Sequence, residues 1–169
     1  PELSMYDDLG SLDGEIADEF VVDNNGNEHI FFSVVDTNTT PNILKIVEVY
    51  RGGGVWQSNI IADRTLTLGT GIGTLQQMDN ELEASLSVDK RAVILKWIDA
   101  PTVNSTYGDI FLCGRTFDAR WGPVINVTQT EEREMSTHIA PEFKIDGNFA
   151  TVFMLKTEAL YSISEDSVD

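Results

Sequence analysis

The sequence contains few of the residues from which metal centres and disulfide frameworks are built. It has one cysteine, Cys113, so no disulfide can form within the chain. Its two histidines, His29 and His138, are too few for a histidine-rich metal site. No apolar run approaches the length of a transmembrane helix, so we expect no membrane insertion. Because Cys113 lies in the alternating run DIFLCGRTF, we expect it to pack as a small apolar side chain.

Positive charge is also scarce. The 169 residues include 11 Lys and Arg against 28 Asp and Glu, which gives a net charge of -17. A chain this acidic repels phosphate backbones, so we expect no nucleic-acid partner. Its apolar content of 41% is enough for the core of one ordinary domain. The acidic balance fits an extracellular or cell-surface protein kept soluble by repulsion.

What the sequence does contain is an internal repeat. Three segments each consist of an apolar run, a short polar turn and a second apolar run, which is the pattern of a β-hairpin. They align on an apolar residue followed by aspartate, at Val22-Asp23, Val88-Asp89 and Ile145-Asp146. The repeat recurs about every 60 residues, which is typical of propeller blades and other repeat architectures.

A second hairpin follows each of the first two segments, at residues 42–65 and 108–130. Trp56 aligns with Trp121 at the start of the last strand, so we expect these tryptophans to occupy equivalent places. The first of these hairpins contains VYRGGGVW. A phosphate-binding loop would need a GK[ST] ending and a following helix, so these glycines predict a tight turn.

We therefore predict an all-β fold, a β-propeller segment of about two and a half four-stranded antiparallel blades. Blade 1 covers about residues 15–65, blade 2 about 81–130 and a partial blade 138–169, within one propeller fragment that spans 1–169. A β-sandwich is the alternative, but it does not explain the recurring tryptophans. We expect the chain to be part of a larger propeller, with remaining blades, a partner chain or self-association covering its ends.

The pattern resembles the sialidase-like, Asp-box (BNR-type) β-propeller repeats, whose hairpin reads S-x-D-x-G-x-T-W. VYRGGGVW keeps Gly53 and Trp56 and has Arg51 at the aspartate position. GRTFDARW keeps Trp121 and has Thr116 at the aspartate position. Segments such as WGPVINVTQTEEREMSTHIAPEF look like repeats in secreted and surface propellers of Bacteroidota. No arginine triad of the sialidase kind can be placed in frame, so the resemblance transfers no catalytic residue.

One turn is a candidate calcium site. DNNGNE resembles the first half of a calcium loop, and its carboxylate and amide oxygens are ligands that calcium takes. The candidate ligands are Asp23, Asn25 and Asn27. The alternative is a hairpin turn in which asparagine and glycine adopt left-handed conformations. Calcium is the only cofactor that the sequence suggests.

The first strand of each repeat carries aligned apolar residues that we expect to be buried. They are Phe20, Leu86 and Phe143, with Val22, Val88 and Ile145 two positions later. Glu19 and Glu142 must then lie on the opposite face of the strand. These two carboxylates could act as acid or base only with a partner and a shifted pKa, so we expect solvated side chains.

Two functions remain open from the sequence. The first is a non-catalytic binding or scaffold module of a secreted or cell-surface protein, with a glycan or protein ligand. The alternative is part of a glycan-active sialidase-like hydrolase, whose catalytic residues lie partly on missing blades. The first hypothesis rests on the lack of any acid, base and nucleophile in a recognisable spacing.

Overall fold

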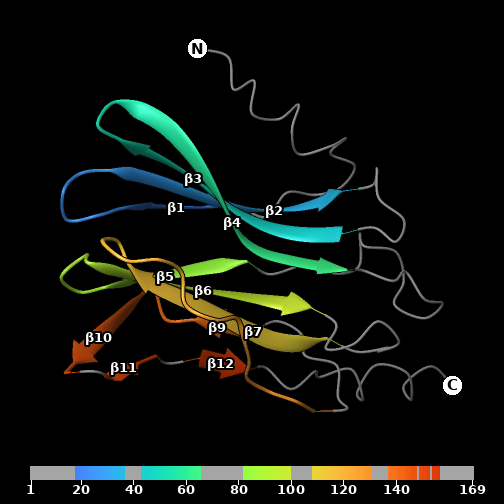
Figure 1. Cartoon of the computed structure of the whole chain (residues 1–169). Coiled ribbons are helices and arrows are strands. Elements are labelled where there is room, and N and C mark those ends of the chain that lie inside the picture. Colours follow the sequence, from blue (N-terminus) through green and yellow to red (C-terminus); the bar gives the residue numbers. More distant parts are fainter. Residues whose placement is uncertain are drawn as a thin grey trace, which may run out of the picture.

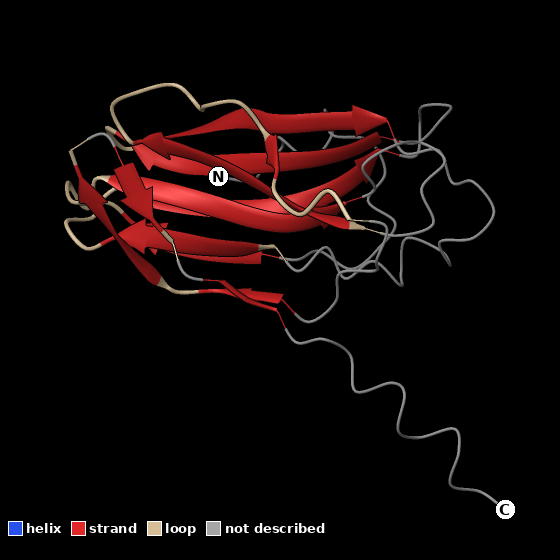
Figure 2. Cartoon of the chain, turned by 90° about the horizontal axis from the view of Figure 1, so that it is seen from below, coloured by secondary structure: helices blue, strands red, loops and turns tan. Residues whose placement is uncertain are grey.

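The computed structural model describes residues 18–36, 43–65, 82–99, 108–130, 137–147, 149–152 and 154–156. Every regular element in these ranges is a β-strand, which confirms the predicted all-β class (Figure 2). Successive strands lie side by side in curled sheets, an arrangement consistent with a propeller-like segment (Figure 1). In the same ranges, no helix has the length and apolar character needed to cross a membrane.

The first unit is a four-stranded antiparallel sheet in the order β1-β2-β3-β4. Its strands are β1 (Asp18–Val22), β2 (Glu28–Asp36), β3 (Ile43–Gly52) and β4 (Val55–Thr65). Gly53 and Gly54 join β3 to β4 with φ angles of 62° and 84°, a left-handed conformation that favours glycine. The predicted tight turn is therefore confirmed.

The second unit repeats this meander with β5 (Glu83–Ser87), β6 (Ala92–Asp99), β7 (Asp109–Thr116) and β8 (Ile125–Asn126). The predicted last strand is present, but the prediction that it begins at Trp121 is wrong, because β8 has only 2 residues and begins at Ile125. Pro123 lacks an N–H group for the sheet. After β8, the side chain of Asn126 accepts a hydrogen bond from the Gln129 amide at 3.3 Å, which turns the chain away.

The third unit contains β9 (Thr137–Ile139), β10 (Glu142–Asp146), β11 (Phe149–Thr151) and β12 (Met154–Lys156). β10 pairs with β11 and β9 with β12, both antiparallel, which confirms the predicted third hairpin. Each arm of this hairpin is interrupted once, the first arm at Ala140 and Pro141. β10 also pairs in parallel with β5, so the second sheet has six strands, which the sequence did not predict.

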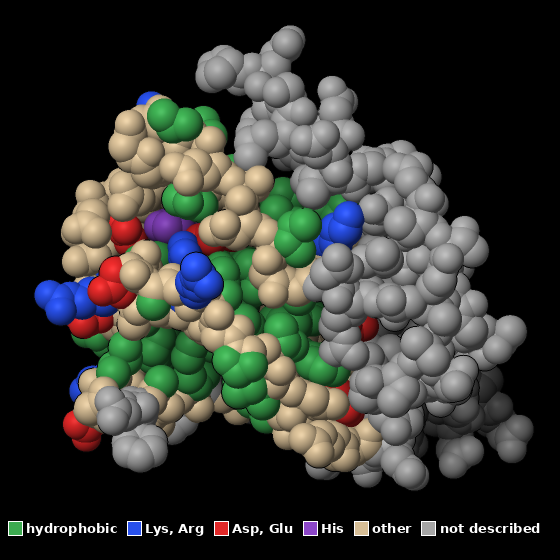
Figure 3. Space-filling model, viewed as in Figure 1, with side chains coloured by type: hydrophobic (Ala, Val, Ile, Leu, Met, Phe, Trp, Pro, Cys, Tyr) green, Lys and Arg blue, Asp and Glu red, His purple; other side chains and the backbone are tan. Residues whose placement is uncertain are grey.

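The main core lies between the first two units. We call the face of a unit that is directed toward the preceding unit its rear face, and the opposite one its front face. The front face of the first unit packs on the rear face of the second, and hydrophobic side chains fill the space between them (Figure 3). The buried residues of this core are Phe31, Ile46, Ala62, Leu82, Val93, Leu95, Trp97, Phe111 and Cys113.

The recurring tryptophans lie on the same face of their units. Trp121 packs against the core between the first two units, on the rear face of the second. Trp56 packs against a smaller cluster on the rear face of the first unit, which includes Val47 and Val49. The two tryptophans therefore share the same face of their units, as predicted, although only Trp121 has a described sheet packed against that face and Trp121 precedes the last strand.

The prediction that the aligned apolar residues of the first strands are buried is wrong in part. Phe143 is 3% exposed, since it packs back onto the second unit, whereas Phe20 is 57% exposed. Both side chains lie on the rear face of their unit. Among the described residues, however, no sheet packs against the rear face of the first unit, so Phe20 is left uncovered. Val88 and Ile145 are also exposed, because they lie where the hairpins turn.

Candidate functional site

A cluster of charged side chains lies inside the core between the first two units. Glu48 comes from the middle of β3, where strand alternation places it on the front face between Ile46 and Tyr50. Arg115 comes from the end of β7 and reaches across from the rear face of the second unit. His29 lies at the start of β2. Burial of three ionisable side chains in an apolar core requires that they satisfy one another.

Glu48 is the centre of this cluster and has no exposed surface. Its Oε1 lies 2.8 Å from Nδ1 of His29 and also accepts a hydrogen bond from Nη2 of Arg115. Its Oε2 accepts hydrogen bonds from Nδ2 of Asn59 at 3.0 Å and from the Trp121 indole at 3.2 Å. Four donors therefore occupy both carboxylate oxygens.

His29 connects Glu48 to Asp23. The imidazole is 3% exposed, and its Nε2 lies 3.7 Å from Oδ2 of Asp23, beyond hydrogen-bond distance. Asp23 in turn accepts hydrogen bonds at 2.8 Å from the backbone amides of Asn25 and Asn27 and from the Asn27 side chain. Both ring nitrogens of His29 therefore face carboxylates, and neither is open to solvent.

Aromatic rings surround the cations of the cluster. The guanidinium carbon of Arg115 lies 5.1 Å from the ring centre of Trp121, 5.5 Å from Phe117 and 5.9 Å from Tyr50. Phe117 also packs on His29, with ring centres 4.4 Å apart. Arginine over aromatic faces within about 6 Å is attracted by the ring quadrupole, and more strongly where water is excluded.

The electrostatics favour ionised carboxylates. Burial alone would raise the pKa of Glu48, but hydrogen bonds from His29 and Asn59 and the charge of Arg115 outweigh it, so the pKa lies below the ordinary 4.5. For Asp23, burial again acts to raise the pKa. The amides of Asn27 and Asn25 overcome it and hold the pKa below the ordinary 3.8.

This arrangement is suited to holding two sheets in register. A general acid or base must be able to reach the proton that it transfers, and its pKa must lie near the working pH. Glu48 meets neither condition, because its oxygens are occupied and its pKa is lowered. Removal of one partner by mutation would leave the other charge buried and unpaired, at a cost of about 3 to 5 kcal/mol. The pair therefore disfavours any packing of the two units that buries Glu48 or Arg115 without its partner.

The candidate calcium ligands all lie in the turn between β1 and β2. The Asp23 carboxylate points to amide donors of this turn and to His29. Gly26, with a φ of 80°, supplies the left-handed conformation that the turn requires. Among the described residues, no group of three or more His, Cys, Asp or Glu side chains is placed to hold a metal ion. The geometry favours the hairpin-turn alternative, and calcium binding by Asp23, Asn25 and Asn27 stays a prediction.

A second polar cluster joins the front face of the second unit to the third. The fully buried Lys96 donates to the Thr137 carbonyl at 2.6 Å and lies 3.6 Å from Glu83. Glu83 accepts a hydrogen bond from the Ile139 amide at 2.6 Å and lies 2.7 Å from Nδ1 of His138. Each interface between successive units thus contains a buried cation bonded to the neighbouring unit.

Sequence reasoning missed the Glu48 cluster, although one signal for it was present. A single glutamate in the apolar run ILKIVEVY falls on the face that otherwise carries apolar residues. The alignment also placed Arg51 opposite Thr116. In the structure Arg51 corresponds to Arg115, because both lie on the rear face of their unit. The guanidinium carbon of Arg51 lies 6.0 Å from the ring centre of Trp56, and that of Arg115 lies 5.1 Å from the ring centre of Trp121. The turn of the second unit is one residue longer, which shifted the alignment.

Comparison with known proteins gave no match. The chain matches no protein-family model, no curated protein and no solved structure.

Proposed function

We propose that this chain is a segment of a sialidase-like β-propeller and serves as a non-catalytic binding or scaffold module. In this proposal the first, second and third units are successive blades. The resemblance of the VYRGGGVW hairpin to Asp-box repeats and the direct succession of four-stranded meanders support it.

The arrangement of the first hairpins supports the propeller interpretation. In a propeller, the first strands of all blades gather around one central channel. Here the Asn24 amide donates to the Lys90 carbonyl at 2.9 Å, which joins the first hairpin turns of the first two units. β5 and β10, the corresponding strands of the next two units, are parallel neighbours. The second unit is covered on both faces, whereas each sheet of a two-layer β-sandwich is covered on one.

The proposal that the module is non-catalytic rests on the burial and hydrogen bonding of Glu48. It is the most completely buried carboxylate of the main core, and four donors from both units occupy its two oxygens. A carboxylate used in this way holds blades together and is unable to reach a substrate. The glutamates on the first strands, Glu19 and Glu142, belong to different units, and Glu142 is exposed.

We further propose a secreted or cell-surface location and a glycan or protein ligand. The net charge of -17 supports an extracellular setting, in which repulsion keeps the protein soluble. The exposed apolar residues Phe20, Val55 and Ile60 on the first unit support a covering partner, which is a remaining blade, another chain or a second copy.

The proposal is tested with a panel of fluorogenic glycosides that includes sialosides. We expect no release of the fluorophore above background. Turnover that Glu19→Gln or Glu142→Gln abolishes, but Glu28→Gln does not, would contradict the proposal in favour of a glycan hydrolase. Glu28 is a suitable control because it lies at the start of β2 and outside the first strands.

A further inference from the structure

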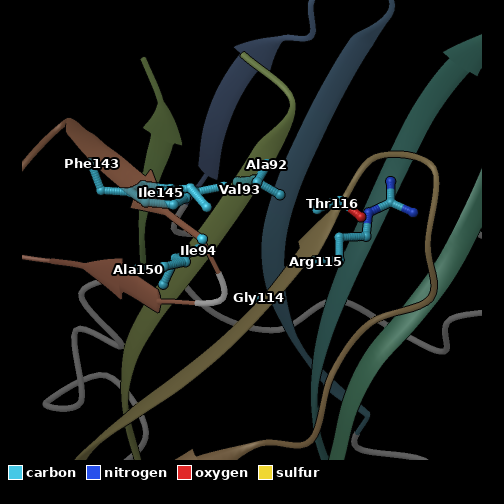
Figure 4. A pocket seen from close by; sticks show the side chains of 10 residues that line it. Ala92, Val93, Ile94, Gly114, Arg115, Thr116, Phe143, Ile145 and Ala150 are labelled. Atoms are coloured by element: carbon cyan, nitrogen blue, oxygen red, sulfur yellow. The ribbon is translucent and has the colours of Figure 1, made fainter. Parts of the chain in front are cut away.

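An open apolar hollow lies between the front face of the second unit and the third unit (Figure 4). Its volume is about 360 Å³. Ile94 and Gly114 line it from the second unit, and Phe143, Ile145 and Ala150 line it from the third. Arg115 borders it through the backbone, but its side chain points away toward the first unit (Figure 4).

This hollow corresponds in position to the filled space around His29 in the preceding interface. In the first unit His29 pairs with Tyr50 across β2 and β3. In the second unit Ile94 pairs with Gly114 across β6 and β7, at the equivalent step before the turn. The second unit thus has Gly114 where the first unit has Tyr50. Because glycine has no side chain, the front face of the second unit is open at this position.

Phe117 shows what fills the space in the preceding interface. It comes from the tip of the second hairpin of the following unit and packs on His29 at 4.4 Å between ring centres. Its amide donates to the carbonyl of Arg91, at the end of the turn of its own first hairpin. A ring placed in the same way on the third unit would lie over Ile94 and beside Ala150, inside the hollow.

The polar partner of the preceding interface has no counterpart here. Glu48 lies two residues before Tyr50, and the residue two before Gly114 is Leu112. Leu112 pairs across the sheet with Lys96, a buried cation. An arginine at the tip of an incoming hairpin would face a like charge at Lys96, and the carboxylate beside it, Glu83, is already bonded to His138 and the Ile139 amide. The chemistry therefore favours an uncharged aromatic side chain.

We propose that the hollow is the docking site for a β-hairpin with an aromatic residue at its tip, which completes the third unit as Phe117 completes the second. This inference rests on the proposed function, because it assumes that the units are successive blades. The ring would cover Ile94, Phe143 and Ile145, and the hairpin amide would bond to the turn between β10 and β11.

The experiment uses the whole chain with labelled isoleucine methyl groups and, as the probe, a synthetic peptide of residues 114–123 that carries Arg115→Gln. This change removes the positive charge that would face Lys96. Its tip carries Phe117, which is already known to fit the equivalent space. We expect the peptide to shift the methyl signals of Ile94 and Ile145 in a saturable way, while Ile46 in the main core serves as the unshifted reference. A peptide with Phe117→Ser should bind at least fivefold more weakly.

A variant of the hollow provides the second arm. Ala150→Trp places a ring in the hollow from within the chain, so it should abolish the shifts caused by the peptide. The dispersed Ile46 signal reports whether this variant is folded, and Ile145→Ser replaces it if that signal is lost.

Equal shifts with both peptides, or no shift at Ile94, would overturn the inference. A dimer that Ala150→Trp dissociates would also overturn it, because the occupant would then be a second copy. Glycoside turnover is measured separately, so failure of the proposed function is distinguished from failure of this inference.

Discussion

At the scale of single residues, Glu48 shows how a β-sheet core accommodates a buried carboxylate. The side chain lies among apolar neighbours, and desolvation of an unpaired charge there would cost several kcal/mol. Hydrogen bonds from Asn59, Trp121, His29 and Arg115 compensate for the lost water. Because these donors come from both units, the compensation exists only when the units are packed together.

The lowered pKa of Glu48 predicts how stability depends on pH. A carboxylate with a lower pKa in the folded state contributes stability that is fully present above the unfolded pKa, here near 4.5, and is lost as the pH falls through the folded value. We expect urea unfolding of the unmodified chain to show a steep loss of stability between about pH 5 and pH 3. Glu48→Gln should lose less over this range, because its side chain does not titrate.

The control for this measurement is Glu142→Gln, which removes an exposed glutamate. Its free energy of unfolding should stay within about 0.5 kcal/mol of the unmodified chain and follow the same pH dependence. If Glu48→Gln also followed the unmodified curve, the carboxylate would not contribute through its ionised form.

Cys113 provides a second test at the residue scale. Its thiol is buried in the main core, and burial raises its pKa to about 11. The thiolate is the reactive form, so the folded protein should react very slowly with Ellman's reagent at about pH 8. Unfolding in urea should restore the rate of a free thiol. Rapid reaction of the folded chain would show that this part of the core opens readily.

At the scale of the elements, the hairpin turns determine which residues face each other. Gly53 and Gly54 both have positive φ, which an alanine adopts only at a cost of about 1 to 2 kcal/mol. We expect Gly54→Ala to lower the free energy of unfolding by about 1 kcal/mol. Gly52→Ala is the matched control, since an added Cβ there would meet only the Tyr50 ring, at 3.7 Å. Equal effects in both variants, measured by urea unfolding, would contradict the turn geometry.

The elements that the sequence predicted correctly are those that depend on local patterns. Each first hairpin was found because alternation and turn residues lie within one short segment, as in the turn at Asp23. The Glu48 cluster depends on contacts between residues 19 and 67 positions apart, and no local pattern reports them. The short β8 was missed because one proline and one turn at Gln129 override a favourable apolar pattern.

At the scale of the whole molecule, the units repeat both their strands and their means of attachment. Arg115 bonds to Glu48 of the preceding unit, and Lys96 bonds to the third unit. Buried polar contacts of this kind favour one register of packing over others, which apolar contacts alone do not ensure. The sequence predicted the succession of units, but the residues that join them became visible only in three dimensions.

The high negative charge predicts a response to salt. Repulsion among the acids should weaken as ions screen them, so the melting temperature should rise with added sodium chloride. Calcium chloride at equal ionic strength should give the same rise, because the Asp23 carboxylate is already occupied by amide donors. A larger rise with calcium that Asp23→Ala removes would instead establish the calcium site at Asp23, Asn25 and Asn27.

The most direct test of the account is a double-mutant cycle on the pair that joins the first two units. Glu48→Gln, Arg115→Met and the double variant are compared with the unmodified chain by urea unfolding at neutral pH. We expect each single change to lower the free energy of unfolding by about 3 kcal/mol. The double change should cost less than the sum of the two, by at least about 1.5 kcal/mol. Additive costs, within about 0.5 kcal/mol, would show that Glu48 and Arg115 act independently and would contradict the claim that this buried pair holds the two units together.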